Sequence, residues 1–194
     1  MSVSESERAL IESRRHTPAP GKDFFVFAYG SLMWRPDFPF VDLAPATLYG
    51  YHRAFCITST HYRGTAERPG LVLGLDRGGT CVGRLYRIGP TDAATVAEYL
   101  HRRELITGCY VPKHVALRLQ DGMRAEGLTF VADRAHYQYA GKLDDDKIAG
   151  IIRHAAGSAG SNRDYLRNTV QHLEEMGIAE CRLHRILKLV EEAE

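Results

Sequence analysis

The sequence of 194 residues predicts an α+β fold, and two observations support this prediction. Apolar runs typical of β-strands fill residues 24–88, and helical patterns fill the tail from residue 148 onward. One further helix lies between strands, which does not give the regular alternation of a doubly wound sheet. We expect an N-terminal appendage at residues 1–22 and one domain at residues 23–194, long enough to bury a full core.

The appendage is expected to contain a short helix. Ser4 and Glu7 have the spacing of a capping box, and apolar residues follow from residue 9. Pro18 and Pro20 would end this helix near His16.

Strands are expected in the first half of the domain. Four apolar runs have the length and composition of strands, at residues 24–28, 47–58, 71–75 and 81–88. Short breaks that contain glycine separate them, at residues 63–65, 69–70 and 78–79.

A helix and a hairpin are expected next. The helix begins at residues 90–92, and its apolar stripe consists of Ala93, Val96, Ala97 and Leu100. Two strands at residues 111–119 and 125–132 flank a turn at residues 120–122.

The tail is expected to form three helices. Each has one apolar stripe: Ile148, Ile151, Ile152 and Ala155 in the first, Leu166, Val170, Leu173 and Met176 in the second, and Leu183, Ile186, Leu187 and Val190 in the third. The breaks fall at residues 157–161 and at Gly177.

Composition excludes several classes of function. The 25 basic and 24 acidic residues give a net charge of +1, which offers no footprint for nucleic acid or an anionic membrane and suits a small neutral or zwitterionic ligand. The longest uncharged run has 11 residues, residues 24–34, against roughly 20 for a membrane-spanning helix.

The cysteines are scattered and form no C-x-x-C pair, so we expect a reduced, cytoplasmic protein without a metal site. The oligomeric state is left open.

The most informative segment is the end of the first strand, where an apolar run stops at a Tyr29, Gly30, Ser31, Leu32 corner. Glycine lets a ligand approach the backbone closely, serine adds a small hydroxyl, and successive N–H groups at such a corner can bind an anion. A simple turn after a buried strand is the alternative. Ser31 lacks the G-x-S-x-G context of a nucleophile, so we interpret it as a binding group.

Glu104 is the second informative feature. It is the next position on the apolar stripe of its helix, so it should face inward, while Arg102 and Arg103 are expected to point elsewhere. Burial raises a carboxyl pKa toward the range of a general acid or base. A structural pair with a nearby cation at the helix end is the alternative.

Two arginines are candidate substrate contacts. Arg63, in a loop, could hold a carboxylate through both guanidinium nitrogens, although loop arginines are commonly solvated. Arg53, in an apolar strand, is a weaker candidate.

Several linked motifs resemble, in order over about residues 24–178, those of the bacterial ChaC proteins. They are residues 29–34 (YGSLMW), 50–56 (GYHRAFC), 63–65 with 69–70, Arg103 and Glu104 with 107–110 (TGCY), and Asn162 with Tyr165 and Leu166. The sequence departs from the family pattern at Ser158 and Ala159, where a Gly-Pro stretch is usual, and residues 1–22 have no counterpart that we can place.

The resemblance implies a small mixed β-barrel with packed helices and the activity of a glutathione-specific γ-glutamylcyclotransferase, with no cofactor. In that family the Y-G-S-L loop grips the γ-glutamyl end of the substrate and a glutamate is catalytic. This implies that Tyr29, Gly30, Ser31 and Leu32 bind glutathione and that Glu104 is the general acid and base. Further expected substrate contacts are Arg53, Arg63, Tyr110 and Tyr165.

The implied reaction is an intramolecular cyclisation that gives 5-oxoproline and cysteinyl-glycine. One alternative is the same chemistry on other γ-glutamyl amines or amino acids. Another is a non-catalytic partner or regulator of cation transport, although the sequence has no basic amphipathic helix or long apolar segment for membrane docking.

Overall fold

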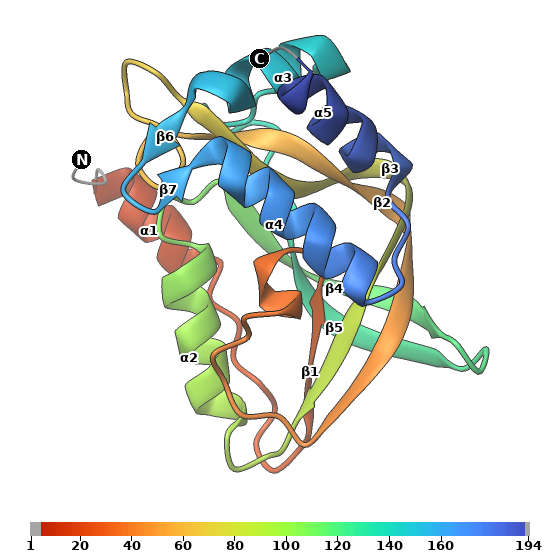
Figure 1. The fold of residues 1–194 in the computed structure, drawn as a ribbon. Coiled ribbons are helices and arrows are strands. Elements are labelled where there is room, and N and C mark those ends of the chain that lie inside the picture. Colours follow the sequence, from red (N-terminus) through yellow and green to blue (C-terminus); the bar gives the residue numbers. More distant parts are fainter. Residues whose placement is uncertain (1–4, 193–194) are drawn as a thin grey trace. The chain divides into compact units, whose positions relative to one another are not determined.

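A computed structural model describes residues 5–192 and confirms the α+β class (Figure 1). Its elements are α1 (Glu5–Ser13), β1 (Phe24–Ala28), η1 (Ser31–Met33), β2 (Asp42–Ser59), β3 (Gly70–Ile88), α2 (Ala93–Glu104), β4 (Tyr110–Leu119), β5 (Arg124–Ala132), α3 (Asp145–His154), β6 (Ala156–Gly157), β7 (Gly160–Ser161), α4 (Asn162–Glu175) and α5 (Cys181–Glu191). The helix expected in the appendage is α1, while Ser4 of the expected capping box lies outside the described residues.

The chain forms two compact units, residues 1–53 with 74–136 and residues 54–73 with 137–194. In the first unit the strands close into a barrel in the order β1, β3, β2, β4, β5. β1 is antiparallel to β3, with Val26 opposite Tyr86, and parallel to β5, with Val26 opposite Leu128. The barrel is therefore mixed, as the resemblance implied.

The strand break expected at residues 78–79 is wrong, because β3 continues from Gly70 to Ile88. Gly78 and Gly79 have φ values of +95° and +72°, and His52 Nδ1 lies 2.9 Å from the Gly78 carbonyl oxygen. Positive φ at paired glycines bends a strand like a bulge without ending it. The two glycines therefore do adopt the backbone conformation of a turn, but the strand continues through them.

Most residues of the expected helix stripes are buried, whereas Ile151, Met176 and Leu187 are half-buried. In the first unit, Ala93, Val96, Ala97 and Leu100 of α2 are all buried, and the end of α1 contacts α2 (Figure 1). In the second unit, α3, α4 and α5 pack on one another. Their large apolar side chains that are at most 1% exposed are Ile148, Ile152, Leu166, Leu173, Ile186 and Val190. The expected boundary at residue 22 stays a prediction.

Candidate active site

The corner after β1 is a single tight turn in the first unit. In η1, Met33 N donates to Gly30 O (2.8 Å), and Arg35 N donates to Ser31 O (2.8 Å). Leu32 is buried, whereas Gly30 and Ser31 are half-buried. The first N–H groups of a helical turn have no acceptor inside it. The corner can therefore offer backbone donors to an anion.

Buried side chains hold the backbone of this corner. Arg53, 4% exposed, donates from Nε to Tyr29 O (2.5 Å) and from Nη2 to Val82 O (2.7 Å). The Tyr86 hydroxyl donates to Leu32 O (2.9 Å). Arg53 thus supports the corner from within the protein, and its direct contact with substrate stays a prediction.

Glu104 is the last residue of α2, and its side chain is 18% exposed. Burial raises the pKa of its carboxyl, while the charge and hydrogen bond of Arg103 act in the opposite direction. The prediction that Arg103 points elsewhere is wrong, because Arg103 Nε lies 3.2 Å from Glu104 Oε1. A long side chain at a helix end can fold back to its neighbour, which the position of its Cβ does not indicate.

Arg103 also connects Glu104 to the corner. Its Nη2 donates to Ser31 Oγ (3.1 Å), and its Nη1 donates to Arg35 O (2.9 Å) and to the Tyr99 hydroxyl (2.5 Å). The two features singled out in the sequence, Ser31 and Glu104, therefore share one guanidinium. Arg103 and Tyr99 were not among the expected site residues, although Tyr99 stands four positions before Arg103, a spacing that brings helical side chains together.

The loop after Glu104 leads into β4 at Tyr110. Burial raises the pKa of the Cys109 thiol to about 11, and the Glu104 charge makes a smaller contribution in the same direction. Tyr110 is half-buried and pairs with Ala132 of β5, and its contact with substrate stays a prediction.

Arg63 and Tyr165 belong to the second unit, where they contact each other. The Arg63 guanidinium lies 5.2 Å from the centre of the Tyr165 ring, and its Nη1 donates to Ser161 O (3.3 Å). The fully buried Asn162 side chain makes two hydrogen bonds to the backbone of Leu71. Its Oδ1 accepts from Leu71 N (2.6 Å) and its Nδ2 donates to Leu71 O (2.7 Å). These bonds fasten the start of α4 to β3 within this unit.

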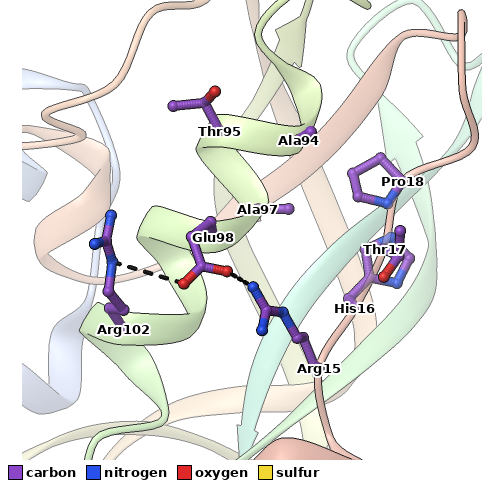
Figure 2. Close-up of a pocket in the computed structure, with 9 residues that line it drawn as sticks. All are labelled: Arg15, His16, Thr17, Pro18, Ala94, Thr95, Ala97, Glu98 and Arg102. Carbon is purple, nitrogen blue, oxygen red and sulfur yellow. Dashed lines mark hydrogen bonds and ion pairs between the residues drawn. The ribbon is translucent and has the colours of Figure 1, made fainter.

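A cavity of about 430 Å³ lies elsewhere in the first unit, between α2 and the segment after α1 (Figure 2). It is lined by Arg15, His16, Thr17, Pro18, Ala94, Thr95, Ala97, Glu98 and Arg102. None of the expected site residues lines it, so we do not take it as the catalytic site. Within residues 5–192, no three His, Cys, Asp or Glu side chains are grouped to hold a metal ion. No helix in the same range is long and apolar enough to cross a membrane.

A mixed barrel of this kind, with packed helices, is the fold of γ-glutamylcyclotransferases. A crystal structure of a γ-glutamyl cyclotransferase specific to glutathione from yeast matches with a TM-score of 0.80 at 23% identity, covering 88% of this chain and 96% of that one. This likeness shows the fold.

The chain belongs to the ChaC-like protein family, whose sequence profile matches residues 24–193. The glutathione-specific γ-glutamylcyclotransferase of Escherichia coli (strain K12) is 38% identical over 163 residues, covering 84% of this chain and 71% of the relative. The human glutathione-specific γ-glutamylcyclotransferase 1 is 32% identical over 157 residues, covering 79% and 71%.

Proposed function

We propose that this protein is a glutathione-specific γ-glutamylcyclotransferase in which Glu104 is the general base and acid. The observation that carries the proposal is the Glu104 carboxyl, whose pKa is raised by burial and which shares Arg103 with Ser31 of the corner. The names of the Escherichia coli and human relatives support glutathione as the substrate.

The proposed reaction stays within one substrate molecule. The α-amino nitrogen of the γ-glutamyl group attacks its own γ-carbonyl carbon, and the bond from that carbon to the cysteine nitrogen breaks. Glu104 takes the proton from the attacking nitrogen and returns it to the leaving nitrogen, so 5-oxoproline and cysteinyl-glycine form without net proton uptake. A raised pKa suits a carboxyl to both transfers near neutral pH, a role worth roughly 10²- to 10⁴-fold in rate.

The remaining residues would fold and orient the substrate. When the two reacting atoms are well oriented, an intramolecular attack reaches effective molarities on the order of 10⁵ M or more. A rigid corner that holds the γ-glutamyl group in that orientation would therefore speed the reaction. The N–H groups of residues 30–32 would hold either the α-carboxylate or the developing oxyanion. Further proposed contacts are Tyr29, Leu32, Arg53, Arg63, Tyr110 and Tyr165. The reaction contains no redox step, and we propose no cofactor for it.

A cytoplasmic location is part of the proposal. All four cysteines are free in the structure, and three of them are buried. Free thiols suit a reducing compartment.

The non-catalytic alternative predicts a fully exposed, salt-bridged Glu104. Glu104 does pair with Arg103, but its side chain is only 18% exposed. Burying a carboxylate is costly, which favours a chemical use for it over a purely structural one.

The test is to incubate the purified protein with reduced glutathione and to measure 5-oxoproline and cysteinyl-glycine together. We expect equal amounts from the wild type and almost none from Glu104→Gln. Glu98→Gln is the matched control, because Glu98 lies on the same helix with its side chain 34% exposed. More than about a tenth of the wild-type rate in Glu104→Gln would remove Glu104 from the role. Comparing kcat/KM for other γ-glutamyl amines and amino acids tests the alternative substrates.

A further inference from the structure

Residues 5–22, which we call the N-terminal strap, contact the part of the first unit that carries Glu104. We propose that Arg14 of this strap is a positioning residue for Glu104, because it holds the loop that directly follows the catalytic carboxylate. This inference rests on the proposed function, since it takes Glu104 as the base.

Arg14 follows the end of α1, and its guanidinium bonds to three acceptors. Nη1 donates to Gly108 O (2.7 Å) and to Tyr110 O (3.1 Å), and Nη2 donates to Asp133 Oδ2 (2.5 Å). The Arg14 and Asp133 side chains are only 15% and 18% exposed. A planar guanidinium that bonds several well-placed acceptors fixes the relative positions of those groups. An exposed ion pair, in contrast, contributes little to stability.

The segment that Arg14 holds is short and close to the base. Gly108 and Tyr110 flank Cys109, and Asp133 N donates to Cys109 O (2.9 Å), so Arg14 and Asp133 together fix three successive residues. At the other end of the loop, Leu105 N still donates to His101 O of α2 (3.1 Å). Gly108 N donates to Leu105 O (3.1 Å), so the segment that Arg14 holds is bonded to the residue next to Glu104.

The pair between Arg14 and Asp133 is charged. Burial favours the neutral acid, but the hydrogen bond and charge of Arg14 still hold the pKa of Asp133 below its usual value. Removing Arg14 would therefore leave a largely buried carboxylate and two carbonyl groups without this donor. The local response is for the loop to open toward water.

Other strap residues contact α2 before Glu104. Glu12 Oε1 lies 3.5 Å from His101 Nε2, and Arg15 pairs with Glu98, which also contacts Arg102 (Figure 2). These contacts are more exposed: the Arg15 side chain is 47% exposed, and that of Glu12 is 61% exposed. Arg15 is therefore a matched control, since it is a strap arginine that does not touch the loop in the contacts described.

An opened loop would both hydrate Glu104 and loosen its orientation. Hydration weakens the effect of burial, so the pKa of Glu104 would fall toward its ordinary value. A small misplacement of a reacting group can cost on the order of 10²-fold in rate. A role in stability alone would lower the melting temperature without moving the pH dependence of catalysis.

The experiment compares Arg14→Met with Arg15→Met in the full chain, measuring kcat, KM, the pH dependence of kcat and amide hydrogen exchange. For Arg14→Met we expect kcat to fall about 10- to 100-fold with KM changed less than about twofold. We also expect the acidic limb of the kcat profile to move to lower pH and exchange to quicken at residues 105–110. Arg15→Met should resemble the wild type in all four measurements. If Arg14→Met does not fold, Arg14→Lys keeps the charge, loses the fork and should show the same changes in smaller measure.

If Arg14→Met keeps the wild-type kcat and pH profile while Glu104→Gln is inactive, the role of Arg14 is overturned and the proposed function stands. Faster exchange in the loop with unchanged catalysis would also overturn this role, because Arg14 would then stabilise the loop without positioning the base. An active Glu104→Gln would instead overturn the proposed base and this inference with it.

Discussion

Arg103 Nε lies 3.2 Å from Glu104 Oε1, so the candidate base is paired with the residue that precedes it on the same helix. Burial and this cation act on the Glu104 pKa in opposite directions, and burial prevails. The same guanidinium donates to Ser31 Oγ. Arg103 therefore lowers the pKa of the carboxyl against the effect of burial and connects the carboxyl to the corner.

Replacing Arg103 with lysine should lower kcat about 10- to 100-fold with a smaller effect on KM. Lysine keeps the charge but cannot bond Glu104, Ser31 and Tyr99 at once, because only arginine offers a planar fork of five donors. Steady-state kinetics with glutathione would measure the change. Arg102→Lys is the control, since Arg102 is 70% exposed, and equal losses in the two variants would contradict the assigned role.

The acidic limb of kcat against pH should lie above the ordinary Glu pKa of 4.5, because burial raises the pKa of Glu104. The base works only when deprotonated, so the rate falls as the pH drops through this raised value. In Arg103→Met the limb should move to still higher pH, because the cation that lowers the pKa is gone. This shift is opposite in sign to the one expected for Arg14→Met, and an unmoved limb would show that Glu104 is not the titrating group.

Glu104→Gln should be at least as stable as the wild type at pH 7, although it is inactive. A raised pKa means that the folded protein binds the proton more tightly than the unfolded chain does. The contribution of Glu104 to stability is therefore present below its ordinary pKa and is lost as the pH rises through the raised value. Urea unfolding at pH 7 and pH 4 would measure this, with the advantage of the variant shrinking at pH 4. A less stable variant at pH 7 would mean that the pair with Arg103 outweighs the cost of burial.

Replacing Asn162 with alanine should destabilise the second unit. It would leave the N–H and C=O of Leu71 without their side-chain partners, at about 1–3 kcal/mol for each buried group left unpaired. The free energy of unfolding would measure the loss. Asn168→Ala, at an exposed position of the same helix, should change stability by less than about 0.5 kcal/mol. Similar values for both variants would show that water replaces the Asn162 bonds.

The sequence predicted most of the fold because the signals for it are local. The spacing of apolar residues in α2 located its buried face, and the order of strands and helices gave the α+β class. Local signals misled at Gly78 and Gly79, where a turn composition occurs inside a continuous strand. Whether two glycines end a strand or bend it depends on the strands beside them.

The sequence by itself determined the family, through its linked motifs, and singled out Glu104 and the glycine-serine corner as the candidate site. Only the tertiary structure decided how they are connected. Arg103 reaches Ser31 across 72 positions of the chain, and Arg14 reaches Asp133 across 119. Such contacts depend on where the barrel brings distant segments together, and a long, flexible guanidinium takes its direction from the acceptors that it finds there.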